Sequence, residues 1–265
     1  MNSDLVTTSF DGASVQGAEV ATLTLNNPQR RNALSLEMIR ALDQSLIAAA
    51  ERQSTRVIVI RGAGPAFSAG HDLAEMQRVR SEQFYAELFG ACTDVMERLH
   101  RLPTPVIAQV HGVATAAGCQ LVAACDLAVC SVDARFATPG VNIGLFCSTP
   151  MVPISRAVGR KRALQMLLTG EMIGATQAVE WGLVNQAVPN ADLDAAVREL
   201  ARKITMASPQ VVGLGKLAFW NQIDETETVA YTTSGEVMRH NAMLDDAHEG
   251  ISAFLEKRAP AWPTP

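Results

Sequence analysis

Two stretches of small residues each follow a short run of apolar, partly β-branched residues. The apolar runs are Val57 to Ile60 and Pro105 to Val110, and both are typical of buried strands. The small-residue stretches run from Arg61 to Leu73 and from His111 to Gly118. Where a helix starts after such a loop, its first backbone N–H groups lack partners and favour a negative oxygen. Two such loops can form an oxyanion hole, although tightly packed turns without a ligand have the same pattern.

The elements around these loops alternate between strand and helix. Residue patterns predict further strands at 20–25 and 127–131 and a short one within 136–144. Helices are expected at 36–52, 91–102, from about 118, and at 149–157, 161–169 and 176–181. This repeat calls for parallel strands joined by right-handed crossovers, and so for an α/β fold. Residues 74–90 are expected to hold some helix and a mobile stretch near the ligand.

The chain becomes entirely helical after Pro189. Helices are predicted at 193–206, 209–222, 226–243 and 247–257. Together they are too thin to enclose a core of their own, so they need a partner surface. The change from mixed to all-helical sequence, near residues 190–207, is the only domain boundary that the sequence indicates.

Composition limits the kind of protein. The chain has 265 residues, 48% of them hydrophobic and 18% charged, with a net charge of −5 and no basic run. Nucleic acid is therefore not expected as a partner, and no apolar run has the length of a membrane span. Five cysteines without a CxxC pair indicate neither disulfides nor a metal site. The first six residues lack the features of a leader, so the sequence predicts a cytoplasmic location.

Several short motifs, in order along the chain, resemble the crotonase (enoyl-CoA hydratase/isomerase) superfamily. The two central ones are Phe-Ser-Ala-Gly-His-Asp-Leu at 67–73 and Ala-Gly-Cys-Gln-Leu at 117–121. Others lie at 23–34 and 249–260, so that the resemblance covers nearly the whole chain. It implies a ClpP/crotonase-like spiral of β-β-α units in a core of residues 1–200. It also implies a C-terminal helical trimerisation region, residues 201–265, that packs on the core and on neighbouring subunits of a homotrimer or hexamer.

The resemblance also assigns a binding site. Members of the superfamily bind an acyl-CoA, so that coenzyme A is part of the substrate and no further cofactor or metal is implied. By position, the backbone N–H groups of His71 and Ala117 would form the oxyanion hole. The positions that match the coenzyme A and substrate contacts are Arg30, Arg31, Ala69, His71, Asp72, Leu73, Ala74 and Gly118. Other interpretations stay open: a solvated pair for the arginines, a helix cap for Asp72, and a titrating base for the His71 imidazole.

The departures from the family pattern concern catalysis. A hydratase of this family uses two glutamates on either side of a water, and here their positions hold Gln120 and Gly140. Neither residue can exchange a proton at neutral pH. The chain is closest to the enoyl-CoA hydratase domain-containing subgroup that lacks both glutamates. We expect a poor hydratase, whose hydration should rise more when both glutamates are restored than when either is restored alone. Cys147 is a further residue of the expected pocket, either as a small lining residue or as a nucleophile.

The sequence therefore predicts a protein that binds an acyl-CoA and stabilises a thioester enolate in an oxyanion hole. If the protein is an enzyme, we expect a lyase or isomerase of fatty acid metabolism. One alternative is an atypical thioesterase, isomerase or decarboxylase that uses Cys147, Glu75 or Glu82. Another is a non-catalytic acyl-CoA-binding or assembly protein. A dinucleotide site is a weaker alternative, because Phe67 stands where the Gly-rich fingerprint that begins at Gly62 requires its third glycine.

Overall fold

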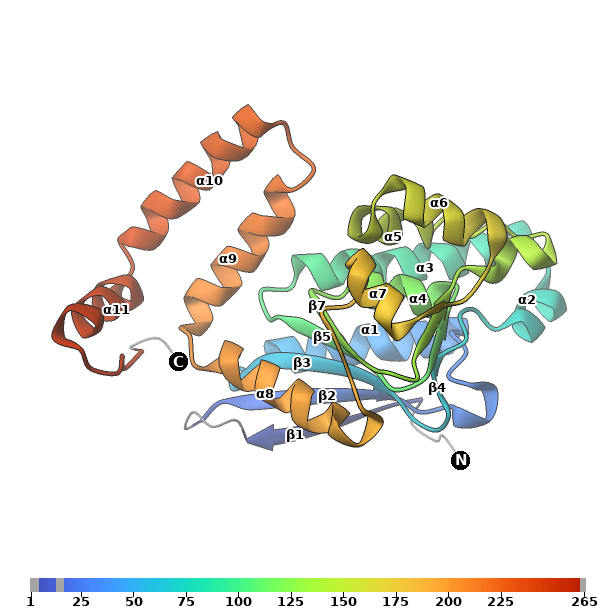
Figure 1. The fold of residues 1–265 in the computed structure, drawn as a ribbon, viewed down its shortest axis with the longest axis horizontal. Helices are drawn as coiled ribbons and strands as arrows, with labels where there is room; N and C mark the ends of the chain where they lie inside the picture. The colour runs from blue at the N-terminus through green and yellow to red at the C-terminus, as the bar shows by residue number, and fades with distance from the viewer. Residues whose placement is uncertain (1–4, 13–16, 263–265) are drawn as a thin grey trace.

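The computed structural model describes residues 5–12 and 17–262 (Figure 1). Residues 1–4, 13–16 and 263–265 lie outside this described part. The first six residues, which lack the features of a leader, therefore lie mostly outside it. The described residues form two sheets, a set of helices packed on them, and a group of C-terminal helices at one end of the molecule. None of the described helices is long and apolar enough to cross a membrane.

The larger sheet has six strands in the order β1-β2-β3-β5-β7-β10. Their bounds are β1 Val6–Gly12, β2 Glu19–Leu25, β3 Thr55–Gly62, β5 Val106–Val110, β7 Leu127–Ser131 and β10 Gln186–Val188. Only β1 runs antiparallel to its neighbour, and the other pairs are parallel. The predicted parallel sheet is therefore confirmed. Strand β1 escaped prediction because it is an edge strand with a single buried residue, so its sequence shows no apolar alternation.

Of the smaller sheet, only the short strand expected within 136–144 was predicted from the sequence, and it is β8. Its strands are β4 Ala66–Ser68, β6 Val113–Thr115, β8 Arg135–Ala137 and β9 Ile173–Gly174, in that order. Strands β4, β6 and β8 follow β3, β5 and β7 of the larger sheet, and each of these pairs precedes a helix. The chain thus repeats a β-β-α unit, as expected. Strands of two or three residues are too short to show a periodic pattern.

Helices cover both faces of the larger sheet. Their bounds are α1 Leu36–Glu51, α2 Leu73–Val79, α3 Glu82–Arg101, α4 Ala117–Ala124, α5 Met151–Val158, α6 Arg160–Thr169, α7 Ala175–Trp181, α8 Leu193–Thr205, α9 Pro209–Gln222, α10 Glu227–Ala242 and α11 Asp245–Glu256. Helices α1, α3 and α4 share the main core with the strands. Helix α8 covers the opposite face, where Leu193, Val197 and Ala201 pack with Val59 and Ile107.

The segment 74–90 contains more helix than expected, and its mobility stays a prediction. Helix α3 begins at Glu82 rather than near residue 91. The Ser81 hydroxyl caps it by accepting a hydrogen bond from the backbone N–H of Phe84. Phe84 and Leu88 are buried in the main core, and this packing holds the helix. The polar residues of the segment hide the helical spacing of its apolar residues, so the sequence did not predict the start of the helix.

The C-terminal arm, which we define as α9, α10 and α11, extends away from the two sheets (Figure 1). Its base is fixed to the core by a largely buried ion pair of 2.6 Å between Lys216 Nζ and Asp126 Oδ2. The indole N–H of Trp220 donates to the other oxygen of Asp126. Beyond α9 the arm has few contacts with the core within this chain, and the proposed division of the chain at residue 200 stays a prediction.

Candidate functional site

A buried asparagine organises the first loop of the expected site. The side chain of Asn32 is fully buried and its Nδ2 donates to the carbonyls of Ala63, Ala66 and Phe67. Its Oδ1 accepts from the backbone N–H of Asn27. One side chain thus fixes the path of the chain from β3 into β4. Sequence reasoning used Asn32 only as part of a motif, because nothing in a single sequence shows which distant carbonyls an amide will reach.

The next residues of this loop are fixed by Leu34. The backbone N–H of Leu34 donates to the carbonyl of Gly70 at 2.8 Å, and its carbonyl accepts from Asp72 N–H at 3.4 Å. Leu34 and His71 form an isolated parallel bridge. In that geometry the backbone N–H of the bridged His71 points away from Leu34. Within the described part of the chain, this N–H group donates to no other atom.

The second loop ends in a strained residue. Ala116, the N-cap of α4, has φ 49° and ψ −120°, a conformation that favours glycine. Its N–H donates to the carbonyl of Ala137, and its carbonyl accepts from Gln120 N–H. These bonds hold the unusual geometry. Ala117 is the first residue of the helix, so its N–H has no acceptor within α4.

The two loops meet at Gly70 and Ala117. A Cβ added to Gly70 would lie 3.2 Å from the backbone nitrogen of Ala117 and 2.8 Å from the Ala116 Cβ. Gly70 also has φ +87°, which suits glycine alone. At the next residue of α4, Gly118 packs so closely on Ser68 that a Cβ would lie 2.4 Å from the Ser68 carbonyl oxygen. The structure therefore brings the peptide between Gly70 and His71 next to the first N–H of α4.

The residues expected to contact coenzyme A border this point. Arg30 forms a 2.7 Å ion pair with Asp72, whose buried carboxylate also accepts from the N–H groups of Ala74 and Glu75. Asp72 is therefore the N-cap of α2. Arg31 has an exposed side chain, and its carbonyl accepts from the N–H of Ala69. The side chains of Leu73 and Ala74 are exposed on the first turn of α2.

The His71 imidazole is part of the packing. It lies edge-on to Phe89 with ring centroids 5.4 Å apart, and its Nδ1 is 3.2 Å from the carbonyl oxygen of Leu34. Burial lowers the pKa of this imidazole below its usual value, so the ring is neutral at neutral pH. Its Nε2 has no hydrogen-bond partner among the described residues.

The structure shows how much room a glutamate side chain would have at Gln120 and at Gly140, the two positions that differ from the hydratase pattern. Gln120 is 3% exposed and its side chain lines a cavity, so a glutamate would fit there. At Gly140 a Cβ would lie 2.0 Å from the Leu145 carbonyl oxygen and 2.8 Å from Cys147 Sγ. The backbone and the thiol occupy the space of a side chain. A glutamate at residue 140 would therefore require the backbone at Leu145 to move.

Cys147 is buried. Burial raises the pKa of its thiol above the usual value, which keeps it in the less nucleophilic thiol form at neutral pH. The described residues contain no cluster of three His, Cys, Asp or Glu side chains that could hold a metal ion. A buried thiol with a raised pKa, packed against Gly140, therefore fits a structural residue better than a nucleophile.

Known proteins resemble the chain over most of its length. A family model described as "Enoyl-CoA hydratase/isomerase" matches residues 16–265. The chain is 47% identical over 243 residues to the mouse "Enoyl-CoA hydratase domain-containing protein 3, mitochondrial", covering 92% of this chain and 81% of the mouse protein. The solved structure of an enoyl-CoA hydratase from Mycobacterium smegmatis has 50% identity and a TM-score of 0.93, covering 97% of this chain and 98% of that one. The human enoyl-CoA hydratase domain-containing protein 3 has 46% identity and a TM-score of 0.91, covering 96% and 99%.

These names correct one expectation from the sequence. The mouse relative is named as a mitochondrial protein, as are the rat and human ones. The prediction of a cytoplasmic location is contradicted by these names. It rested on the unpaired cysteines and on the lack of leader features in the first six residues, and unpaired cysteines do not distinguish one reducing compartment from another.

Proposed function

Because the chain belongs to the enoyl-CoA hydratase/isomerase family and has the crotonase fold, we propose that His71 and Ala117 hold the thioester carbonyl of an acyl-CoA. Their backbone N–H groups would stabilise the enolate-like charge that develops on this oxygen. The observation that carries the proposal is the contact of Gly70 with the Ala117 nitrogen. The strained backbone of Ala116 supports it, since such strain persists where a site requires it.

The coenzyme A moiety would lie along α2. Arg30 is half exposed and its charge is partly compensated by Asp72, whereas Arg31 has no ion pair among the described residues. We infer that both arginines face the phosphates, with Arg31 as the freer cation. The exposed side chains of Leu73 and Ala74 and the backbone of Ala69 would contact the remainder of the coenzyme.

We propose binding without efficient hydration. General acid–base work contributes about 10²–10⁴-fold, and the amide of Gln120 and the hydrogen of Gly140 supply none of it. The alternative nucleophile or base residues offer little. Cys147 is a buried thiol with a raised pKa, Glu75 accepts a hydrogen bond from the Leu36 N–H, and Glu82 lies exposed in the first turn of α3.

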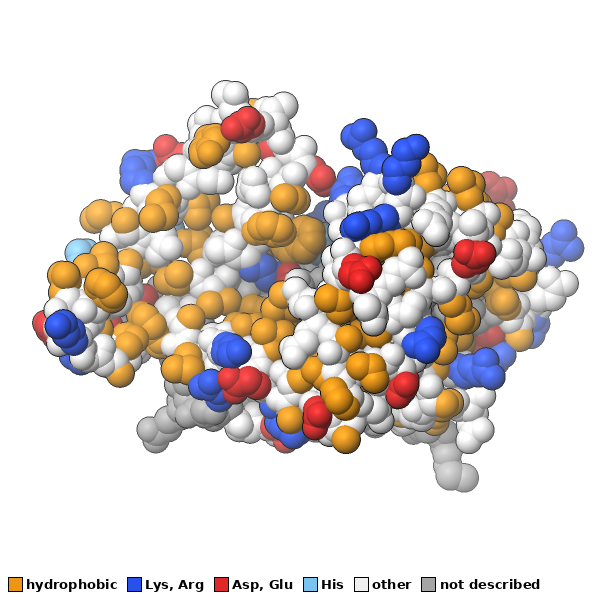
Figure 2. All heavy atoms as spheres, viewed as in Figure 1, with side chains coloured by type: hydrophobic (Ala, Val, Ile, Leu, Met, Phe, Trp, Pro, Cys, Tyr) orange, Lys and Arg blue, Asp and Glu red, His pale blue; other side chains and the backbone are white. Residues whose placement is uncertain are grey.

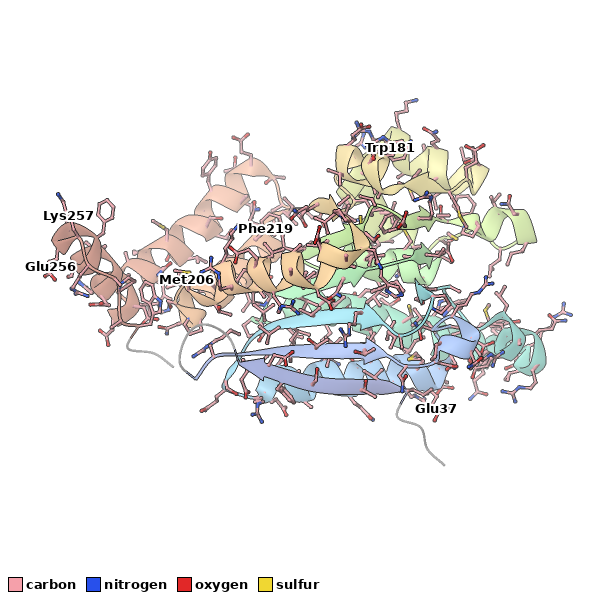
Figure 3. The ribbon with its side chains drawn as sticks, turned by 60° about the horizontal axis from the view of Figure 1, so that its bottom comes forward. Glu37, Trp181, Met206, Phe219, Glu256 and Lys257 are labelled. Atoms are coloured by element: carbon pink, nitrogen blue, oxygen red, sulfur yellow. The ribbon has the colours of Figure 1, made fainter. Side chains whose placement is uncertain are left out.

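The second candidate function is a non-catalytic acyl-CoA-binding or assembly protein, and the assembly part of it rests on the C-terminal arm. Hydrophobic side chains lie along its surface (Figure 2), and Phe254 is 82% exposed. Phe219 on α9 and Met206 at the end of α8 are also exposed (Figure 3). Exposed apolar surface of this extent marks a protein interface. We therefore propose a homotrimer or hexamer in which the arm packs on neighbouring subunits, which a monomer in sedimentation would contradict.

The proposed function is tested with Ala117→Pro, which removes one oxyanion donor because proline has no N–H. Binding of an acyl-CoA should weaken by about 1 kcal/mol, and binding of an enolate-like inhibitor by roughly 3–4 kcal/mol. A thioether analogue without the carbonyl should lose nothing. Calorimetry measures all three, after circular dichroism and oligomer size have matched the wild type. Equal losses for thioester and thioether would show that Ala117 does not serve the carbonyl.

A further inference from the structure

The last motif of the family resemblance, residues 249–260, plays no part in the acyl-CoA site described above. In the structure it spans most of α11 and the turn that follows this helix (Figure 3). Lys257 ends the helix in the left-handed conformation, with φ 56°. The N–H of Arg258 donates to the carbonyl of Ala253 at 3.0 Å. A turn of this kind reverses the chain at the end of a helix, so residues 258–262 return toward α11.

Glu249 joins the two sides of this turn. Its carboxylate accepts two hydrogen bonds from the Arg258 guanidinium, 2.6 Å from Nη1 to Oε1 and 2.9 Å from Nη2 to Oε2. The backbone N–H of Ala261 donates to Oε1 at 2.7 Å. A bidentate pair of this kind is stronger and more directional than a single contact. The hydrogen bonds from Arg258 and Ala261 lower the pKa of Glu249 to about 2, so the carboxylate is charged at neutral pH.

Trp262 connects the returning segment to the start of the C-terminal arm. Its ring lies against Gly250, since a Cβ at residue 250 would lie 3.4 Å from a ring carbon. Its indole N–H donates to the carbonyl of Met206 at 2.9 Å. Met206 follows the last residue of α8. The returning segment therefore links α11 to the junction of α8 and α9, and the arm closes on its own starting point (Figure 1).

A second contact closes the arm at the same junction. The Ser208 hydroxyl, at the N-cap of α9, donates to Oδ2 of Asp246 in the first turn of α11. The same hydroxyl accepts a hydrogen bond from the N–H of Val211. Both Ser208 and Asp246 are buried. Helix α11 is thus held to the junction through Asp246 near its start and, through the returning segment, by Trp262.

The arm has little apolar burial of its own. Among the described residues, those buried on its helices are Gly213 on α9 and Asp246 and Ala253 on α11, and α10 has none. Hydrophobic stabilisation is proportional to the apolar area removed from water, and a glycine and an alanine remove little of it. The shape of the arm within one chain therefore depends on its polar contacts.

These contacts turn an apolar surface outward. Asp246 and Ala253 are seven residues apart and lie on the inner face of α11. Ile251 and Leu255 lie on the opposite face and are 59% and 73% exposed, with the exposed Phe254 beside them. This apolar surface is part of the one that a neighbouring subunit covers in the assembly proposed above. Its position relative to the core depends on how firmly α11 is held.

We propose that Glu249, Arg258 and Trp262 form a clasp that fixes the shape of the arm and thereby determines how tightly subunits associate. With the clasp closed, the apolar surface is in position before a second copy of the chain binds it. With the clasp open, α11 has to be ordered when subunits meet, and this loss of conformational entropy weakens association. The inference rests on the proposed assembly, in which a second copy covers the arm.

The test measures subunit association of the full chain by sedimentation velocity over a range of concentrations. Glu249→Ala removes the acceptor of three hydrogen bonds across the turn, so association should weaken about tenfold or more. Trp262→Phe keeps a flat ring but removes the donor to Met206, so association should weaken about threefold.

The matched control is Glu256→Ala, which removes the other carboxylate that pairs with Arg258. Glu256 Oε2 is 2.6 Å from Arg258 Nε, but the two residues are only two positions apart, so this pair joins no separate segments. Its loss should leave association unchanged. Hydrogen exchange of the amides in 245–256, measured by mass spectrometry, reports whether the clasp is open. Exchange should become faster in both clasp variants and stay at the wild-type rate in the control.

Three results would overturn the inference. Unchanged association of a folded Glu249→Ala protein would exclude the clasp and leave the proposed assembly intact. Weaker association without faster exchange in 245–256 would show that Glu249 contacts the partner directly and does not act through the shape of the arm. A wild type that sediments as a monomer would remove the proposed assembly and the inference with it, and would leave the proposed oxyanion hole untouched. Circular dichroism verifies that each variant is folded.

Discussion

The Cα of Gly70 faces the backbone nitrogen of Ala117 so closely that a Cβ at residue 70 would lie 3.2 Å from it. Two loops from different β-β-α units thereby converge at one point. The first is held by the Asn32 side chain and the second by the backbone bonds of Ala116. Such fixed N–H groups need no reorganisation when charge develops on a substrate oxygen, which is the condition for effective electrostatic stabilisation.

Gly70→Ala should damage this site. The new methyl would meet the Ala116 Cβ at 2.8 Å and the Thr115 carbonyl at 2.9 Å, and φ is +87°. We expect a loss of stability of about 1–3 kcal/mol and at least tenfold weaker thioester binding in the folded fraction. Denaturant titration and calorimetry measure the two effects. Gly90→Ala, where no atom lies within 4 Å of the new Cβ, is the control; similar behaviour of both variants would refute the prediction.

Ala116→Gly should have the opposite effect on stability. Glycine adopts φ 49°, ψ −120° without the steric cost that alanine has there. Relief of strain raises the free energy of unfolding, whereas the greater freedom of glycine in the unfolded chain lowers it. The net effect should be a stabilisation of about 1 kcal/mol. The melting temperature reports this change, and acyl-CoA binding should stay constant because Ala117 is not moved. A lower melting temperature would mean that the alanine conformation is unstrained.

Hydration of crotonyl-CoA should be slow and hard to restore. Gln120→Glu introduces one carboxylate but not the second, so we expect turnover well below that of ordinary hydratases, by about 10²-fold or more. Gly140→Glu should destabilise the protein, because its Cβ would lie 2.0 Å from the Leu145 carbonyl. Steady-state hydration assays and melting curves test both expectations. Fast hydration by the wild type would point to an unrecognised carboxylate.

Asn32→Ala should destabilise the first loop. It would leave the carbonyls of Ala63, Ala66 and Phe67 and the N–H of Asn27 without this partner. At about 1–3 kcal/mol for each buried polar group that stays unsatisfied, we expect a loss of roughly 3 kcal/mol or more. Chemical denaturation measures it. A loss below about 1 kcal/mol would show that water replaces the amide and that the loop is fixed by other contacts.

Acid should destabilise the protein through its buried imidazoles. Burial lowers the pKa of His71 and of His100 below the usual value of 6.5. Between that value and the lower folded-state pKa, the unfolded chain binds more protons, so stability falls as pH falls through this window. His100→Phe should make the loss of stability between about pH 7 and pH 5 smaller. An unchanged pH dependence of the unfolding free energy would mean that His100 is not buried as a neutral ring.

Long, regular elements were predictable from the sequence. The helix expected at 36–52 is α1, because Ser35 supplies the N-cap and apolar residues recur at helical spacing. The strand expected at 105–110 is β5, all of whose residues are buried. Of the short strands of the smaller sheet, only β8 was expected, within 136–144. Strands β4 and β6 could not be predicted, because pairing with distant strands rather than local pattern defines them.

The site was predictable only in part. The family motifs give the positions of His71 and Ala117, but the role of Asn32 depends on contacts 31 to 35 residues away in the sequence. The obstruction at Gly140 likewise depends on how the chain turns back to place Leu145 and Cys147. Sequence spacing treats Gly140 as a vacant position, whereas the folded chain fills it.

The most direct test of the acyl-CoA site is a crystal structure of the protein with a bound non-hydrolysable acyl-CoA analogue that retains the carbonyl. We predict that the carbonyl oxygen lies roughly 2.7–3.1 Å from the backbone nitrogens of both His71 and Ala117. A carbonyl oxygen bound elsewhere, with these two N–H groups facing solvent, would contradict the proposal that the two loops form an oxyanion hole.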